Sequence, residues 1–329
     1  MENESQINMD TASIIRDLRT FSDRGITELS VHDEKVSGDR AALLKLCSAI
    51  QKDAPDLFVS LKVRADVLDR QLVVELGKIY CSLEIPLCGS EKGGSLLLDK
   101  KLYSSRAESL NRADLVFGFD MDFGTKTGDT FKLFKDRIDF AATLYPNHID
   151  FPQLEDGSPQ PKPTGLYSSR DLDFSESIAF ACKTFYSAGR AVPWFNTVTR
   201  ALKISPSAFF ADFAEWQICN NCSRSTGFSP DDTKHSDIEK MQLLFIKEKL
   251  EEKHAQMLFD AISDMVRLNG AFSRVAAEGE ESIVETAYNP DDILSPFAMD
   301  LAKFCDGVTL EPCRVKIFAG EDSPDYKIL

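Results

Sequence analysis

The chain has 329 residues, of which 43% are hydrophobic and 28% charged, and its 53 acidic and 38 basic residues give a formal net charge of −15. This composition is typical of a globular protein with a sizeable core, and no apolar run approaches the roughly 20 residues needed to cross a bilayer. The negative charge disfavours nucleic acid and anionic membranes as partners. The first ten residues show neither a basic region nor an apolar core, so we expect a cytoplasmic protein.

The eight cysteines are scattered through apolar or strand-like surroundings. Without an export signal they are expected to be reduced thiols rather than a disulfide framework. Cys219 and Cys222 form a CxxC pair near the end of a predicted helix. A redox motif usually opens a helix after a strand, and no neighbouring motif supplies further zinc ligands, so helix-end packing is the favoured interpretation.

Residues 11–154 alternate between helical and strand periodicity. A helix is predicted over residues 11–24, with Thr11 as a possible N-cap and Gly25 at its end. Strands are predicted at residues 26–33, 57–63, 81–87, 115–120 and 148–154, with helices between them. Their starts are 31, 24, 34 and 33 residues apart, which is the length of a βαβ unit and requires parallel pairing. The first half is therefore α/β.

The predicted strands alternate apolar with polar residues. In the second strand, Val59 and Leu61 oppose Ser60 and Lys62. An open parallel sheet covered by helices on both faces would be almost continuously apolar. The alternation instead predicts a barrel, full or partial, with apolar faces under the helices and polar faces toward a lumen.

Active-site groups of a barrel gather at the carboxyl ends of its strands. Those ends carry His32, Asp33, Glu34, Arg64, Asp66, Glu84 and Asp120. Any one of them could simply cap a helix or bond within a loop, but as a set they indicate a site. His148 and Asp150 lie on the presumed lumen face and are candidates for acid–base catalysis.

The amino-acid composition and the predicted secondary structure change after Gln153. A segment rich in Pro, Gly and Ser is followed by a predicted helix at residues 175–188, by further helices over residues 191–268, and by a β-like segment at residues 307–318. We therefore expect a partial barrel over residues 1–190 and a mostly helical domain over residues 191–329.

Four segments together resemble the barrel of radical S-adenosylmethionine enzymes of the cobalamin-linked type. Residues 25–50 are similar to its second strand, acidic turn and helix, and residues 59–76 to its third strand and helix. LEIPLCG, from Leu83, resembles the fourth strand, and residues 115–155 resemble the fifth and sixth. The resemblance implies an incomplete TIM-like barrel with S-adenosylmethionine and a four-iron four-sulfur cluster as cofactors.

The same resemblance implies roles for particular residues. Asp33 and Glu34 would lie near the amino group of S-adenosylmethionine, and Arg64, Glu84 and Asp120 near its ribose or carboxylate. The chain departs from the family at position 86, where Pro replaces the usual Gly, and in the loop after Asp120.

The Cys-x3-Cys-x2-Cys motif that binds the cluster is absent from the sequence. The first predicted helix leaves about ten residues before it, too few at ~3.3 Å per residue for a strand and a cluster loop, so we expect the first β unit to be missing. Two functions follow. The chain is either part of a split or truncated radical S-adenosylmethionine enzyme, completed by a polypeptide that carries the cluster motif, or a cluster-free, non-catalytic barrel that binds a small molecule or a protein. No metal ligands are predicted within the chain itself, and its substrate is not indicated.

Overall fold

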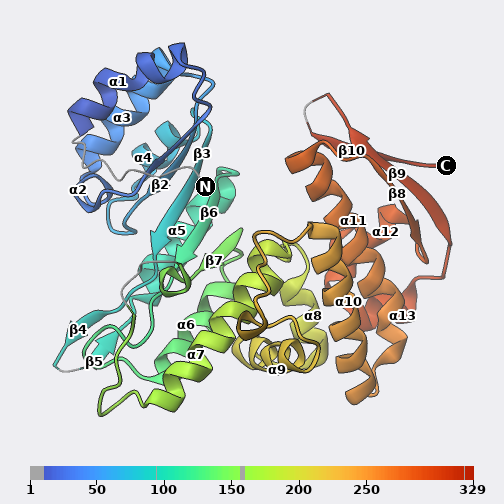
Figure 1. Ribbon diagram of the computed structural model, residues 1–329. Coiled ribbons are helices and arrows are strands. Elements are labelled where there is room, and N and C mark those ends of the chain that lie inside the picture. The colour runs from blue at the N-terminus through green and yellow to red at the C-terminus, as the bar shows by residue number, and fades with distance from the viewer. Residues whose placement is uncertain (1–10, 94, 156–159, 322) are drawn as a thin grey trace. The chain divides into compact units, whose positions relative to one another are not determined.

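The structure is a computed structural model that describes residues 11–93, 95–155, 160–321 and 323–329 (Figure 1). The chain forms two compact units: the first runs to residue 129 and includes residues 144–152, and the second comprises residues 130–143 and 153–329. The domain boundary near residue 190 stays a prediction, because compact packing units need not coincide with domains. None of the helices in the described ranges is long and apolar enough to cross a membrane.

The first unit is built on a parallel sheet of five strands. These are β1 (Glu28–Val31), β2 (Phe58–Lys62), β3 (Cys81–Pro86), β6 (Val116–Asp120) and β7 (His148–Asp150). They lie in the order β1-β2-β3-β6-β7, so spatial order follows chain order. Right-handed crossovers between strands in this order place the connecting helices on one face. The predicted parallel α/β architecture is confirmed, while the described strands form an open sheet with β1 and β7 at its edges.

The described residues of this unit form five helices: α1 (Thr11–Asp23), α2 (Glu34–Ser37), α3 (Arg40–Asp53), α4 (Arg70–Leu76) and α5 (Lys100–Arg112). Figure 1 shows α1 and α3 side by side. Asp39, Asp69 and Asp99 each accept a hydrogen bond from a backbone N–H in the first turn of the helix that follows. Such caps contribute about 1 kcal/mol each and fix where the helices begin. A hairpin of β4 (Ser90–Lys92) and β5 (Ser95–Leu97) follows β3 and was not predicted.

The two faces of the sheet differ as the alternation predicted. Odd-numbered strand residues such as Leu61, Leu83 and Phe119 are buried. The ring of Tyr103 on α5 contacts Phe119 with centroids 6.1 Å apart, which shows that this is the helix-covered face. Even-numbered residues lie on the opposite face and are mostly polar.

The end of the sheet corrects one predicted boundary. The strand expected over residues 148–154 ends at Asp150, and Pro152–Leu154 form a 3-10 turn. Proline has no N–H to donate to a ladder, so it ends the strand.

The second unit is mainly helical. Its longer helices are α6 (Phe131–Ala142), α7 (Ser169–Cys182), the π-helix η2 (Lys183–Ala188), α8 (Phe195–Leu202), α9 (Pro206–Cys219), α10 (His235–Glu252) and α11 (Phe259–Glu278). The helix expected from Ser175 begins at Ser169, because Ser168 and Asp171 form a capping box. Phe185 in η2 is the centre of an aromatic core and contacts the rings of Trp194, Phe195, Phe209, Phe213 and Phe245.

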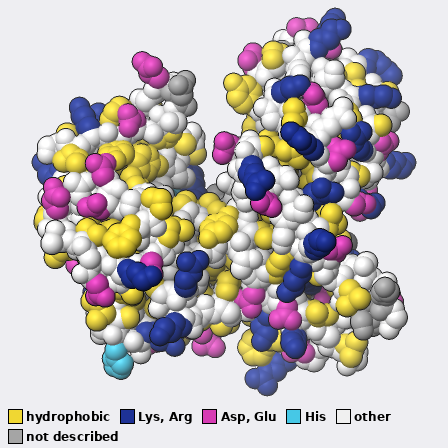
Figure 2. Space-filling view, turned by 180° about the vertical axis from the view of Figure 1, so that it is seen from behind, with side chains coloured by type: hydrophobic (Ala, Val, Ile, Leu, Met, Phe, Trp, Pro, Cys, Tyr) yellow, Lys and Arg dark blue, Asp and Glu magenta, His cyan; other side chains and the backbone are white. Residues whose placement is uncertain are grey.

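A three-stranded antiparallel sheet lies at the end of the chain. Its strands β8 (Ser282–Thr286), β9 (Cys313–Ala319) and β10 (Pro324–Ile328) have the order β10-β9-β8. The predicted β-like segment therefore contains a strand, but β8 and β10 were missed. Short helices α12 (Pro290–Ile293) and α13 (Leu301–Gly307) lie between β8 and β9. On the face that Figure 2 shows, basic and acidic side chains are interspersed.

Candidate functional site

The register of the first sheet brings polar side chains from different strands into one row. Lys62 pairs with Glu84, Glu84 with Gly118, and Gly118 with His148. His32 directly follows β1 and extends the row, since Val31 pairs with Leu61. All of these residues are even-numbered and share the face opposite the helices.

The site comprises this row and its polar neighbours, which we call the polar cluster. Its members are His32, Ser60, Lys62, Glu84, Asp120, His148 and Asp150. Asp120 and Asp150 pair with each other across β6 and β7, and each lies two residues closer to the carboxyl end of its strand than Gly118 and His148 do. Two histidines, three carboxylates, a lysine and a serine thus come from all five strand regions.

Gly118 makes room for the imidazole of His148. A Cβ at position 118 would lie 2.0 Å from Cε1 and Nδ1 of that ring, so only glycine fits there. Asp150 Oδ2 lies 2.5 Å from His148 Nδ1 and orients the ring. Burial alone would lower the pKa of His148, but the hydrogen bond to Asp150 and the nearby carboxylates outweigh it, so the pKa is raised. The protonated form of this imidazole is therefore favoured.

Glu84 contacts two other members of the polar cluster, Ser60 and His32. Its Oε1 accepts a hydrogen bond from the Ser60 hydroxyl at 2.8 Å and lies 3.3 Å from His32 Nε2. Burial would raise the pKa of Glu84, but the hydrogen bonds from His32 and Ser60 leave that pKa lowered. The same bond to Glu84 raises the pKa of His32. The pair is thus stabilised in its charged form.

The pKa of Asp120 is shifted in the opposite direction from that of Glu84. Its side chain is only 12% exposed, and the nearest cation, Lys62 Nζ, is 3.5 Å from Oδ2. Burial, together with the negative charge of Glu84, raises the pKa of Asp120 to about 6. Glu84 and Asp120 therefore have pKa values pushed apart, the environment in which one carboxyl can stay ionised while another exchanges a proton.

The other sequence-predicted site residues take up local roles. Asp33 caps α2 by accepting a hydrogen bond from the Lys35 N–H at 2.7 Å, and Glu34 is the exposed first residue of that helix. Arg64 forms an ion pair of 2.5 Å with Asp66, which raises the pKa of Arg64. In the described part of the chain, the hydrogen bonds and ion pairs of Asp33, Glu34 and Arg64 do not reach the polar cluster.

Of the residues expected at the site, five are brought together: His32, Glu84, Asp120, His148 and Asp150. Ser60 and Lys62 were not singled out as site residues from the sequence. Their positions in β2 could have identified them, because alternate residues of a strand point to the same face of the sheet and both are even-numbered.

The thiols of the first unit do not fit an iron–sulfur cluster, which requires converging thiolates. Burial raises the pKa of Cys47 to about 11 and that of Cys81 to about 12, which disfavours their thiolates. Cys47 lies on α3, Cys81 begins β3 on the helix-covered face, and Cys88 follows β3. Across the described ranges, no three His, Cys, Asp or Glu residues are grouped so that they could hold a metal ion.

Comparisons with known proteins give a limited likeness. No family model and no curated protein matches the sequence. Among solved structures, the chain is similar to the radical S-adenosylmethionine methyltransferase TsrM from Kitasatospora setae, in one structure with cobalamin and a four-iron four-sulfur cluster bound and in another with tryptophan substrate and an S-adenosylmethionine analogue. In both, the TM-score is 0.35 and the identity 12%, over 43% of this chain and 30% of that chain. The likeness thus spans less than a third of the length of TsrM and establishes neither a family nor a function.

Proposed function

We propose that the first unit binds a small cationic molecule at the polar cluster without an iron–sulfur cluster, and that S-adenosylmethionine is the first ligand to test. The cluster carries three carboxylates, Glu84, Asp120 and Asp150, against one fixed cation, Lys62. These oxygen acceptors suit a ligand with an ammonium or sulfonium group and hydroxyl donors. Bound there, S-adenosylmethionine would supply an electrophilic carbon on its sulfonium centre.

The observation that carries this proposal is the placement of Asp120. A buried carboxyl with a pKa raised to about 6 costs the native state free energy above that pH. Such groups gather at functional sites, and a cationic ligand bound beside Asp120 would offset this cost. Asp120 ends β6, and carboxyl ends of parallel strands are where α/β proteins bind ligands.

The sheet is proposed to be an arc of a TIM-like barrel. Its strands follow chain order, and one face is polar. On that face, Phe58, Tyr80 and Val116, near the amino ends of the strands, are 39%, 66% and 44% exposed. Exposed aromatic and apolar side chains on the same face as the polar cluster suit an organic ligand.

His148 is proposed as the acid–base residue and Asp150 as the group that orients it. Asp150 bonds Nδ1, which leaves Nε2 as the nitrogen that can exchange a proton with a bound molecule. The proposal does not include Asp33, Glu34 and Arg64, because Asp33 caps α2, Arg64 is paired with Asp66, and Glu34 is an exposed residue of α2.

A second candidate, that the chain is one part of a split radical S-adenosylmethionine enzyme, is favoured by the edge strand β1. Among the described strands it pairs with β2 alone; Ser30 in β1 and Ile26 just before it are exposed. A complementing polypeptide that carries the cysteine motif could add a parallel strand there. Neither nucleic acid nor a membrane is proposed as a partner.

Isothermal titration of the purified chain with S-adenosylmethionine tests the first proposal. We expect saturable binding without added iron or sulfide, and a loss of about tenfold or more in Glu84→Gln, since a charge-assisted bond contributes about 1.5–3 kcal/mol. Asp56→Asn, an exposed change of equal charge, should bind as the wild type does. Absence of binding by the wild-type chain would overturn the proposal. Cluster formation and S-adenosylmethionine binding only after a cysteine-bearing partner is added anaerobically would support the split enzyme instead.

A further inference from the structure

Strand β3 presents a half-exposed track on the face that carries the polar cluster. Buried and half-exposed residues alternate along it, and Ser82 and Glu84 are half-exposed. Tyr80, directly before β3, is 66% exposed. Its carbonyl accepts a hydrogen bond from the Val59 N–H at 2.9 Å, as the Glu84 carbonyl does from the Val63 N–H, so Tyr80 continues the alternation of the strand. The track therefore runs from Tyr80 past Ser82 to Glu84.

The amino end of this track is apolar. The register of β2 and β3 places Phe58 beside Tyr80, and Val116 on β6 pairs with Ser82. Phe58 and Val116 are 39% and 44% exposed. Neighbouring strands lie ~4.8 Å apart, so these side chains adjoin one another across three strands and are not scattered singly. We call Phe58, Tyr80 and Val116 the apolar patch.

Ser82 lies midway along the track, between the apolar patch and Glu84. Its hydroxyl forms no hydrogen bond with the described residues, so it can still both donate and accept. The hydroxyl of Ser60, which pairs with Ser82, is engaged, because it donates to Glu84 at 2.8 Å. Successive parts of the track thus offer apolar contact, a free hydroxyl and then the charges of the polar cluster.

We propose that the cationic ligand of the polar cluster also carries a flat aromatic ring, which rests on the apolar patch, and a hydroxyl group that bonds to Ser82. The inference rests on the binding proposed for the polar cluster. Tyr80 and Glu84 are four residues apart, which is roughly 13 Å along a strand at ~3.3 Å per residue. Contacts with the rings of Phe58 and Tyr80 favour an aromatic group over an aliphatic one. S-adenosylmethionine fits, because its adenine, its ribose hydroxyls and its charged end follow one another in this order.

The charges set the direction in which such a ligand lies. A ring placed at the carboxyl ends of the strands would cover Lys62, Glu84 and Asp120 and remove them from water without new hydrogen bonds, which is costly for charged groups. A cation placed on the apolar patch would lie far from these carboxylates. The ring therefore belongs at the amino ends of the strands, which makes Phe58 and Tyr80 specificity-determining residues.

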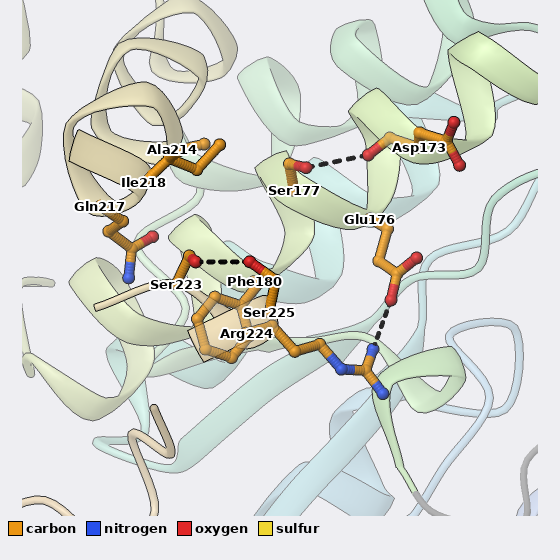
Figure 3. Close-up of a pocket in the computed structure, with 10 residues that line it drawn as sticks. All are labelled: Asp173, Glu176, Ser177, Phe180, Ala214, Gln217, Ile218, Ser223, Arg224 and Ser225. Carbon is orange, nitrogen blue, oxygen red and sulfur yellow. Dashed lines mark hydrogen bonds and ion pairs between the residues drawn. The ribbon is translucent and has the colours of Figure 1, made fainter. Parts of the chain in front are cut away.

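Another hollow with apolar side chains lies in the second unit. It is a cavity of ≈390 Å³ lined by α7, α9 and residues 223–225 (Figure 3). Phe180 and Ile218 give it apolar surface, while Glu176 and Arg224 are paired with each other at 2.8 Å. A ligand cation would there have to displace Arg224 from Glu176, so a molecule that joins a cation to a ring fits the track better. Ile218 is 58% exposed and is the position at which we test the cavity.

Calorimetric titration of the full chain with S-adenosylmethionine and with S-methylmethionine, a sulfonium amino acid that has no ring, tests the inference. We expect the wild-type chain to bind S-adenosylmethionine about tenfold or more tightly than S-methylmethionine. Tyr80→Ala should weaken S-adenosylmethionine binding about tenfold more than S-methylmethionine binding, and Tyr80→Phe, which keeps the ring, should recover most of that loss. Val74→Ala, at a 53% exposed position on α4, and Ile218→Ala in the cavity should change neither affinity.

The outcomes separate this inference from the proposal on which it rests. No binding of either ligand by the wild-type chain would overturn both. Equal affinities for the two ligands, equal losses or none in Tyr80→Ala, or a loss of S-adenosylmethionine binding in Ile218→Ala alone would overturn only the placement of the ring. Tyr80 is exposed, so its variants should keep the native circular dichroism spectrum, and Phe58→Ala repeats the test from the neighbouring strand.

Discussion

Replacing Asp120 by Asn should stabilise the protein at alkaline pH while it removes ligand binding. The pKa of Asp120 is raised from 3.8 to about 6, so between these values the native carboxyl is protonated while that of the unfolded chain is ionised. Stability therefore falls as pH rises through this window and stays reduced above it. A shift of about two pKa units corresponds to ~3 kcal/mol at most. Asparagine resembles the protonated carboxyl and carries no such penalty.

Urea unfolding followed by circular dichroism measures this effect. Asp120→Asn should raise the free energy of unfolding by ~2–3 kcal/mol at about pH 8, and by ~0.5 kcal/mol at about pH 4, where the native carboxyl is already protonated. Asp56→Asn, on the surface of the same unit, should change it by less than ~0.5 kcal/mol at either pH. An Asp120→Asn protein that is less stable at the higher pH, or equally shifted at both, would refute the reasoning.

Two further substitutions probe the geometry of the polar cluster. Gly118→Ala places a Cβ 2.0 Å from the His148 ring, and we expect the urea midpoint to fall by the equivalent of about 2–3 kcal/mol. Gly77→Ala, whose Cβ would make only ordinary contacts at 3.6 Å, should leave it unchanged, and equal effects would contradict the close approach. Glu84→Gln should lower the pKa of His32 in an NMR titration, because the bond to Glu84 is what raises it. An unchanged His32 pKa would show that the pair is not formed.

The fold of the first unit was largely predictable because its signals are local. The starts of the strands could be placed from βαβ spacing, and the alternation of Val59 and Leu61 with Ser60 and Lys62 gave the two faces of the sheet. Whether the sheet closes was not predictable, since closure depends on pairing at the edges and no residue in β1 or β7 specifies a partner.

The candidate site was predictable in part. Glu84 and Asp120 lie within strands, where even-numbered side chains all point to the same face of the sheet. Their convergence with His148 therefore followed from the register of the strands. Asp33 and Arg64 lie beyond the strand ends, where local partners compete: Asp33 caps a helix and Arg64 pairs with Asp66.

Two strands of the second unit were not predicted from the sequence. The helices were recognised, but β8 and β10 were missed because each is five residues long, and β8 has only two buried side chains and β10 none. The turn after β8 is fixed by the Asp264 carboxylate, which accepts hydrogen bonds from the N–H groups of Ala287 and Tyr288 at 2.7 and 2.9 Å. Such contacts join residues more than 20 positions apart and leave no local signature in the sequence.

The most direct test of the polar cluster as a ligand site is an NMR titration of the histidine ring signals with S-adenosylmethionine. The chain has four histidines, so the spectrum is simple to assign by substitution. His32 and His148 should shift and saturate together, whereas His235, which is buried in the second unit with its pKa lowered to about 4, should not move. Unchanged signals of His32 and His148 at saturating ligand, or equal shifts of all four rings, would contradict binding at this cluster.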